Sequence, residues 1–200
     1  PSRAAARRLL QAGGWLTVSN LVNPVLITVD RFALGALVSA AAAGYYAAAY
    51  EVATKMWIVT GALCPVLFPA IAATARAQPA RAGALVARGA RALLVVLFPA
   101  ALAMVMAGRA VLATWVSPAF AAFGAASLAL LAIGMFVNGV GQAAFTALQA
   151  AGRARVTALA HLAQVVPFAV ALWLVAPRFG PTGVAAVTVA RLAVDAGVMW

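Results

Sequence analysis

Residues 30–55 read DRFALGALVSAAAAGYYAAAYEVATK, and this stretch sets charged side chains into a segment that a lipid bilayer would otherwise accept. Its charges are Asp30, Arg31, Glu51 and Lys55. The whole chain follows the same pattern, because 66% of its 200 residues are hydrophobic and 8% are charged. A soluble domain is about half apolar and about a quarter charged. The composition therefore predicts that lipid, rather than water, surrounds most of this protein.

Long uncharged runs supply the membrane-spanning segments. Each run is long enough for the roughly 20 apolar residues that cross a hydrocarbon core as a helix. We expect helices rather than strands because the runs are continuous and Ala-rich instead of alternating. The sequence thus predicts an all-α polytopic membrane protein, a bundle of about six transmembrane helices. The predicted helices span residues 14–38, 45–75, 93–115, 125–149, 156–175 and 183–200.

The arginines predict how these helices are oriented. Nine of them fall before the first helix or in the connections 76–92 and 150–155, which all lie on one side of the bundle. The other side receives Arg109 and Arg178. The positive-inside rule then places the Arg-rich side, and both ends of the chain, in the cytoplasm. The longest predicted loop, residues 75–92, is cytoplasmic in this arrangement.

The formal net charge of +11 does not indicate nucleic-acid binding, because the cations lie in short loops and no soluble basic module presents them. Contact with anionic lipid headgroups explains them more simply. Cys64 is the only cysteine, which excludes an internal disulfide and a cysteine metal cluster. Gly139 and Gly141 imitate a dinucleotide fingerprint, but no strand precedes them, so we interpret them as sites of close helix packing. No metal or cofactor is expected.

Charges inside the predicted helices carry most of the functional information. Each costs about 2.5–3.5 kcal/mol at a helix centre unless a partner or water compensates it. At the helical rise of about 1.5 Å per residue, the charges of the first two helices lie about 9–15 Å below the outer surface, Arg191 lies near that level, and Asp195 lies one turn deeper. We interpret them as candidate substrate-binding residues of a hydrated cavity. The six candidates are Asp30, Arg31, Glu51, Lys55, Arg191 and Asp195.

A second interpretation of the same charges stays open. Three cations balance three anions, so all six could form internal ion pairs that fix helix register. Glu51 and Lys55 are four residues apart and share a helix face, whereas Asp30 and Arg31 point about 100° apart and need partners elsewhere. His161 has two interpretations as well, as a proton-coupling group or as a packing histidine. The amides of Asn138, Gln142 and Gln149 are candidates for hydrogen bonds across helices.

Several short motifs resemble the start of a lobe in the polysaccharide flippases of the multidrug/oligosaccharidyl-lipid/polysaccharide exporter superfamily. They are Ser19-Asn-Leu-Val-Asn23, Asp30-Arg31 with Gly35, Gly44-Tyr45-Tyr46 with Tyr50, and Pro65-Val-Leu-Phe-Pro69. The resemblance is strongest over residues 14–75. It implies a bacterial inner-membrane transporter, not an enzyme, built from two six-helix lobes. Such proteins flip undecaprenyl-diphosphate-linked oligosaccharides by alternating access for polysaccharide and lipopolysaccharide (O-antigen) biosynthesis, driven by an ion gradient of H⁺ or Na⁺.

This resemblance implies that residues 1–200 form a single lobe, the C-terminal half of a flippase of 12–14 helices. The chain begins without Met and stops at Trp200 inside an apolar segment, so we expect a portion of a longer protein whose N-terminal lobe is absent. The family supports Asp30 and Arg31 as a recurrent pair, whereas the other candidates rest on depth. The alternatives are a multidrug or cation antiporter and a peptidoglycan-precursor flippase of the same superfamily.

Overall fold

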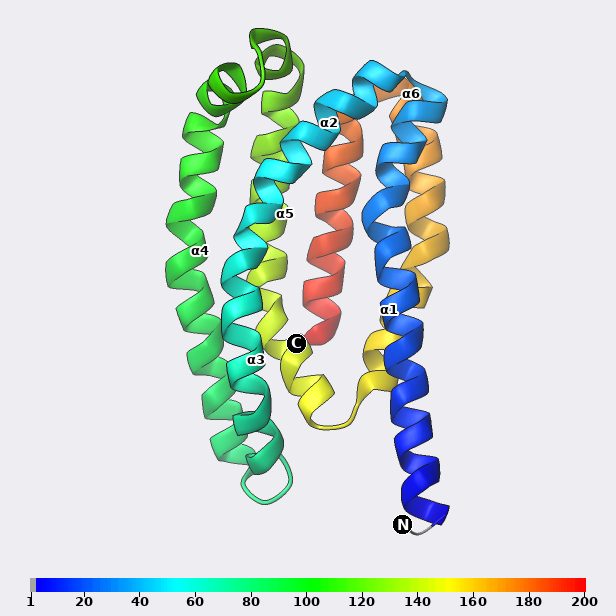
Figure 1. Ribbon diagram of the computed structural model, residues 1–200, viewed down its shortest axis with the longest axis vertical. Coiled ribbons are helices and arrows are strands. Elements are labelled where there is room, and N and C mark those ends of the chain that lie inside the picture. The colour runs from blue at the N-terminus through cyan, green and yellow to red at the C-terminus, as the bar shows by residue number, and fades with distance from the viewer. Residues whose placement is uncertain (1–2) are drawn as a thin grey trace.

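The computed structural model describes residues 3–200, with side chains at residues 14 and 15 and from 17 onward, and this part of the chain is helical without strands (Figure 1). The predicted all-α class is confirmed. The side chains of Arg3, Arg7 and Arg8 lie outside the described residues. The elements are α1 (Arg3–Leu37), α2 (Ala40–Ala53), a 3₁₀ turn η1 (Thr54–Met56), α3 (Trp57–Thr74), α4 (Pro79–Trp115), α5 (Pro118–Ala150) and α6 (Ala154–Met199).

Four helical segments of the described chain are long and apolar enough to cross a membrane, which makes this a multi-pass membrane protein. They are residues 40–74, 79–115, 118–150 and 154–199. The last contains two limbs, because Gly180 leaves the helical region at φ 56° and ψ −147° and the ribbon turns back on itself there (Figure 1). Glycine accepts this positive φ at no steric cost. The total of six crossings remains a prediction.

The predicted cytoplasmic loop 75–92 was wrong. Helix α4 begins at Pro79, so only residues 75–78 connect it to α3, and Arg81, Arg88 and Arg91 lie on the first turns of a helix. The cause is local: alanine and arginine favour helix even outside the hydrocarbon core, and proline is well suited to the first helical position. Hydropathy reports where lipid begins, and the helix continues beyond that boundary.

The predicted helix 45–75 also differs from the structure. It begins earlier, at Ala40, where the hydroxyl of Ser39 caps α2 by accepting a hydrogen bond from the amide of Ala42 at 3.1 Å. It is then interrupted by η1, which separates α2 from α3. A 3₁₀ stretch within a longer helix often marks a hinge. Glu51 lies on α2 just before this break, and Lys55 lies within it.

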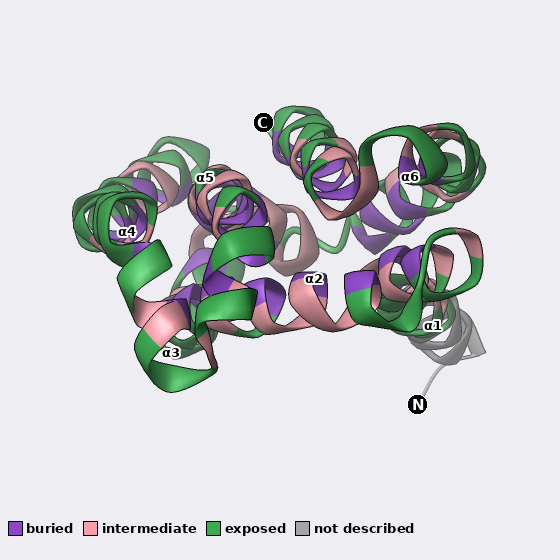
Figure 2. Ribbon diagram, turned by 90° about the horizontal axis from the view of Figure 1, so that it is seen from above, coloured by how far each residue is buried: buried purple, intermediate pink, exposed green. Residues whose placement is uncertain are grey.

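Small residues let α5 pack closely against its neighbours. A Cβ atom on Gly139 would lie 2.5 Å from Leu97 Cδ1 of α4, and one on Gly141 would lie 2.9 Å from Ala196 Cβ of α6. The interpretation of these glycines as packing sites is therefore confirmed. Buried residues line the facing sides of the helices, while much of α4 is exposed (Figure 2).

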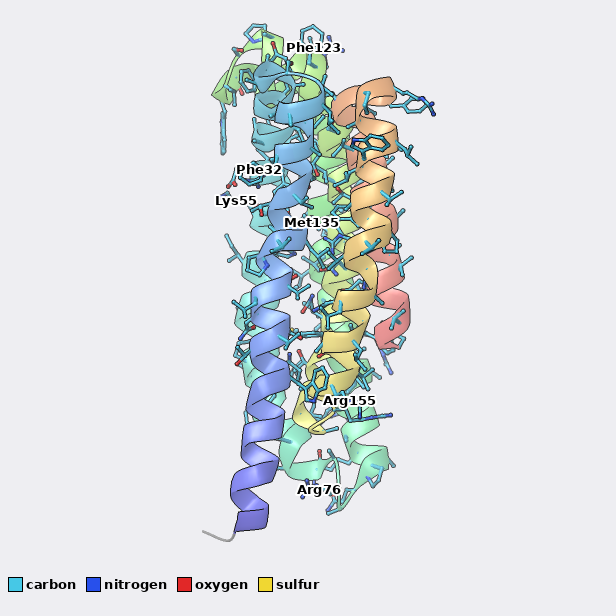
Figure 3. All side chains as sticks on the ribbon, turned by 90° about the vertical axis from the view of Figure 1, so that its right-hand side faces the viewer. Phe32, Lys55, Arg76, Phe123, Met135 and Arg155 are labelled. Carbon is cyan, nitrogen blue, oxygen red and sulfur yellow. The ribbon has the colours of Figure 1, made fainter. Side chains whose placement is uncertain are left out.

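The two ends of the bundle differ in chemistry. The N-terminus and the connections 75–78 and 151–153 share one end (Figure 1), and Arg76 and Arg155 lie there, opposite Phe123 (Figure 3). At the other end, the ring of Tyr45 packs on Phe120 and Phe123 with centroids 5.0 and 5.1 Å apart. The predicted grouping of the loop arginines is confirmed for the described side chains. The cytoplasmic side of the membrane remains a prediction.

Candidate functional site

Three of the six candidate charges meet in an open groove between α1 and the continuous segment α2, η1 and α3, which we call the charged groove. Arg31 Nη2 lies 3.4 Å from Glu51 Oε1, and Lys55 Nζ lies 3.8 Å from Glu51 Oε2. The guanidinium of Arg31 also lies 4.5 Å from the centre of the Tyr50 ring. The groove has a volume of about 550 Å³, and the side chains of Glu51 and Lys55 are 59% and 64% exposed.

Asp30 is separate from this groove and wholly buried. Its carboxylate accepts a hydrogen bond from the Tyr46 hydroxyl at 2.5 Å, and another from the backbone amide of Arg31 at 2.8 Å. The Tyr46 hydroxyl also lies 3.1 Å from the hydroxyl of Thr188. This network joins α1, α2 and α6. The divergence of two adjacent helical residues thus directs Asp30 into the bundle and Arg31 towards Glu51.

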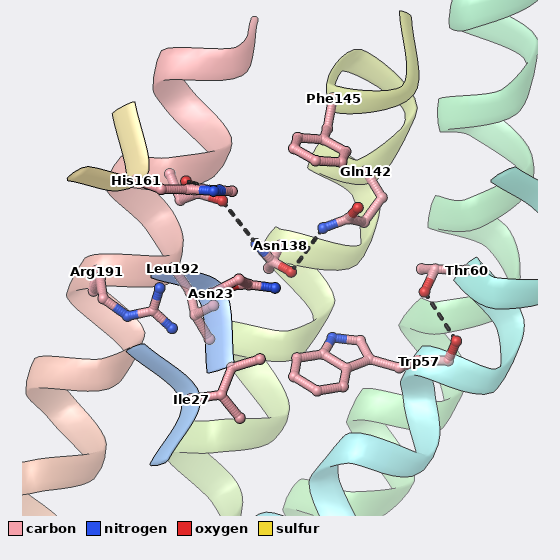
Figure 4. Close-up of a pocket in the computed structure, with 11 residues that line it drawn as sticks. Asn23, Ile27, Trp57, Thr60, Asn138, Gln142, Phe145, His161, Arg191 and Leu192 are labelled. Atoms are coloured by element: carbon pink, nitrogen blue, oxygen red, sulfur yellow. Dashed lines mark hydrogen bonds and ion pairs between the residues drawn. The ribbon is translucent and has the colours of Figure 1, made fainter. Parts of the chain in front are cut away.

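The other charges line a second, more enclosed pocket, which we call the polar cavity. It has a volume of about 240 Å³ and lies between α1, α3, α5 and α6 (Figure 4). Its walls combine amides, aromatic rings and three ionisable side chains. The lining residues are Asn23, Ile27, Trp57, Thr60, Asn138, Gln142, Phe145, His161, Arg191, Leu192 and Asp195.

Asp195 is held by a network of side chains from α5 and from the first limb of α6. Gln164 Nε2 donates to it at 3.0 Å and Asn138 Nδ2 at 3.4 Å, and His161 Nε2 lies 3.4 Å from the same carboxylate. Asn138 in turn accepts a hydrogen bond from Gln142 at 3.3 Å. Burying a carboxylate is costly unless hydrogen bonds replace its water, and this network supplies them.

Arg191 has no comparable partners. It lies one turn from Asp195 and lines the same cavity, yet none of the three ion pairs among the described side chains includes it. Its guanidinium lies 5.0 Å from the centre of the Phe168 ring, and its Nε has no hydrogen-bond partner. A cation that is 9% exposed and lacks a paired anion can bind an anionic group.

Ile27 and Trp57 line both the charged groove and the polar cavity. They therefore form the wall between the two. The structure brings Arg31, Glu51 and Lys55 together on one side of this wall, and Arg191 and Asp195 on the other. A single shared cavity had been expected from depth alone, and the structure instead contains two adjacent compartments, with Asp30 outside both.

Four residues of the polar cavity and of the networks around Asp195 and Asp30 were not predicted from the sequence. Trp57 and Asn23 line the polar cavity, Gln164 bonds Asp195, and Tyr46 bonds Asp30. Gln164 could have been found, because it is a polar residue in an uncharged run, three positions after His161 and therefore near it on the helix. The predicted bond across helices is confirmed for Asn138.

Among the side chains that the structure describes, no three His, Cys, Asp or Glu residues gather closely enough to hold a metal ion. The chemistry of the two pockets is that of ion pairs, amides and aromatic rings.

A family model described as "Polysaccharide biosynthesis protein" matches residues 1–122, which is more than half of the chain. The chain is also 29% identical over 194 residues to a Shigella flexneri protein named "Putative O-antigen transporter". That alignment covers 95% of this chain and 45% of the relative, so the chain spans less than half the length of that relative. No solved structure matches the chain.

Proposed function

Because the chain belongs to the polysaccharide biosynthesis protein family, we propose that it is one lobe of a transporter that flips an undecaprenyl-diphosphate-linked oligosaccharide across the bacterial inner membrane. The observation that carries the proposal is the polar cavity within a bundle of membrane-spanning helices, with the unpaired cation Arg191 in its wall. The relative from Shigella flexneri, named as an O-antigen transporter, supports the same class of cargo.

The cavity combines the groups that such a cargo requires. Arginine presents a planar fork of donors that matches phosphate oxygens, so Arg191 binds the diphosphate. The amides of Asn23, Asn138 and Gln142 offer both donors and acceptors to sugar hydroxyls, and Trp57 offers an apolar ring face. Arg31 and Lys55 in the charged groove supply further cations beyond the wall.

Alternating access requires a second lobe. In this proposal the chain is the C-terminal lobe of a flippase of 12–14 helices, both of its ends are cytoplasmic, and the exposed side of the charged groove faces the N-terminal lobe. The break at η1 lies beside Lys55 and Trp57, so bending there would move the wall between groove and cavity. No covalent step is involved, and the protein is not an enzyme.

His161 and Asp195 are proposed as the coupling pair. Histidine changes charge within the physiological pH range, and here it touches the carboxylate at the centre of the cavity network. Protonation of His161 would strengthen its attraction for Asp195, and deprotonation would release it. Binding of Na⁺ by the Asp195 carboxylate is the alternative to proton coupling. Measuring transport separately in a proton gradient and in a sodium gradient identifies the coupling ion.

Deletion and complementation in the native host test the proposed function. The full-length gene should restore surface polysaccharide, whereas Arg191→Gln and Arg31→Ala should abolish it without loss of protein from the membrane. Arg178→Gln is the matched control, because this arginine lies near the turn of α6 at Gly180 and lines neither pocket. Normal polymer with Arg191→Gln and Arg31→Ala, or resistance to cationic drugs in place of polymer, would contradict the proposal.

A further inference from the structure

A second groove lies between the two limbs of α6, and we call it the α6 groove. It has a volume of about 450 Å³ and its walls are made by alanine, valine, proline and phenylalanine side chains. Gln164 and Arg191 are the two exceptions. Val194 and Val198 on its rim are 55% and 53% exposed. Exposed apolar side chains on a membrane-spanning helix suit contact with hydrocarbon, so this groove has the chemistry to accept a lipid chain.

Arg191 connects this groove to the polar cavity, because its side chain lines both. Its Nε has no hydrogen-bond partner, and neither does Oε1 of Gln164 beside it, although both atoms are buried. Asp195 attracts this guanidinium without forming an ion pair with it, so the buried charge of Arg191 is only partly compensated. A phosphate group placed at Arg191 would compensate the remaining charge of the guanidinium. It would have the apolar α6 groove on one side and the amide-lined polar cavity on the other.

We propose that the α6 groove binds the first isoprenoid units of the lipid-linked substrate, with the phosphate at Arg191 and the sugars in the polar cavity. This assignment rests on the proposed function and adds the path of the lipid chain. It makes the hairpin of α6 the portal through which substrate enters from the bilayer. The α6 groove and the polar cavity would then hold the two ends of one molecule.

The shape of the site favours a polyprenyl phosphate over a bulk phospholipid. One apolar groove reaches Arg191, which suits a single chain attached to phosphate, whereas a phospholipid brings two chains on a glycerol. Beyond Arg191 the cavity continues with Asn138 and Gln142, so the occupant needs a polar head that extends past its phosphate. Glycans attached to a polyprenyl diphosphate meet both requirements.

Photo-cross-linking tests this proposal. Full-length protein in nanodiscs of phosphatidylethanolamine and phosphatidylglycerol is irradiated with a polyprenyl phosphate that carries a diazirine near its phosphate. Mass spectrometry should locate the label on both limbs of α6, for example at Ala163 and Val194. Arg191→Gln and Ala163→Trp should each reduce this labelling at least fivefold, because one removes the cation and the other fills the groove.

Ala169→Trp is the matched control, since Ala169 is an exposed alanine on the same limb that does not line the groove, and labelling should stay within twofold of wild type. Ala190→Trp fills the groove from the other limb and serves if Ala163→Trp is poorly folded. Labelling displaced equally by excess phosphatidylglycerol would assign the groove to bulk lipid and overturn the proposal.

The same experiment separates this inference from the proposed function. Label confined to the charged groove, or unchanged by both tryptophan variants, would refute the α6 path while complementation by the full-length gene still supported flipping. Specific label in the α6 groove combined with failure of complementation would retain the lipid site and refute the proposed transport.

Discussion

Removal of the Tyr46 hydroxyl offers a quantitative test of how the buried charge of Asp30 is tolerated. Tyr46→Phe keeps the ring, which is fully buried, and deletes one bond of 2.5 Å to a carboxylate and one of 3.1 Å to Thr188. A hydrogen bond to a charged group contributes about 1.5–3 kcal/mol and a neutral one about 0.5–1.5 kcal/mol. We therefore expect Tyr46→Phe to lower the free energy of unfolding by about 2–4.5 kcal/mol.

The measurement is unfolding of the purified protein in mixed micelles with increasing SDS, followed by circular dichroism. Tyr45→Phe is the control, because Tyr45 contacts Phe120 and Phe123 through its ring, and it should change stability by less than about 0.5 kcal/mol. In an Asp30→Asn background, which keeps an acceptor but removes the charge, the cost of Tyr46→Phe should fall by about 1 kcal/mol. Equal costs in both backgrounds would refute the role assigned to this carboxylate.

Three further predictions follow from the packing and the two pockets. Gly141→Ala should lower the unfolding free energy by about 1–3 kcal/mol, because the new Cβ would meet the backbone of α6 at 3.1 Å. Gly61→Ala is the control, because a Cβ there has no neighbour within 4 Å, and its stability should not change. Equal midpoints of thermal unfolding for the two variants would contradict this prediction. In a cysteine-free background, a charged membrane-impermeant maleimide should label Lys55→Cys and spare Asp30→Cys, and the reverse pattern would show that the exposure assigned to them is wrong. His161→Gln should reduce transport driven by a proton gradient, because it removes the group proposed to carry the proton, and proton-driven transport at the wild-type rate would remove His161 from coupling.

Helical class and the presence of membrane-spanning segments follow from hydropathy, because a lipid environment leaves few ways to satisfy the hydrogen-bonding groups of a backbone. The same signal misplaces the ends of helices. Arg81 and Arg88 lie outside the apolar run, yet they are part of α4. Helix propensity depends on the residue type, and alanine and arginine favour helix whether or not lipid surrounds them. The turn at Gly180 was anticipated only as a break between segments, and the sequence alone does not indicate how tightly the two limbs pair.

The predicted depths along the helices place Arg31 near Glu51, and the structure contains this contact. Depth does not show which side of each helix faces which neighbour. Rotation about the helix axis depends on packing partners that a single sequence does not contain. Trp57 therefore went unnoticed, although it separates the charged groove from the polar cavity. Arg191 and Asp195 also lie four residues apart on one helix, yet no ion pair joins them, and the carboxylate is bound by His161 and Gln164 from the other limb of α6.

Reconstituted translocation tests the proposed transport most directly. Full-length protein is placed in proteoliposomes with a fluorescent undecaprenyl-diphosphate oligosaccharide, and a membrane-impermeant lectin reports when the glycan changes leaflet. Wild-type protein should translocate the glycan under an ion gradient, and Arg191→Gln should slow it at least tenfold while Arg178→Gln does not. Translocation at the wild-type rate by Arg191→Gln, or none by the wild-type protein under either a proton or a sodium gradient, would contradict the assignment of the polar cavity as the substrate site.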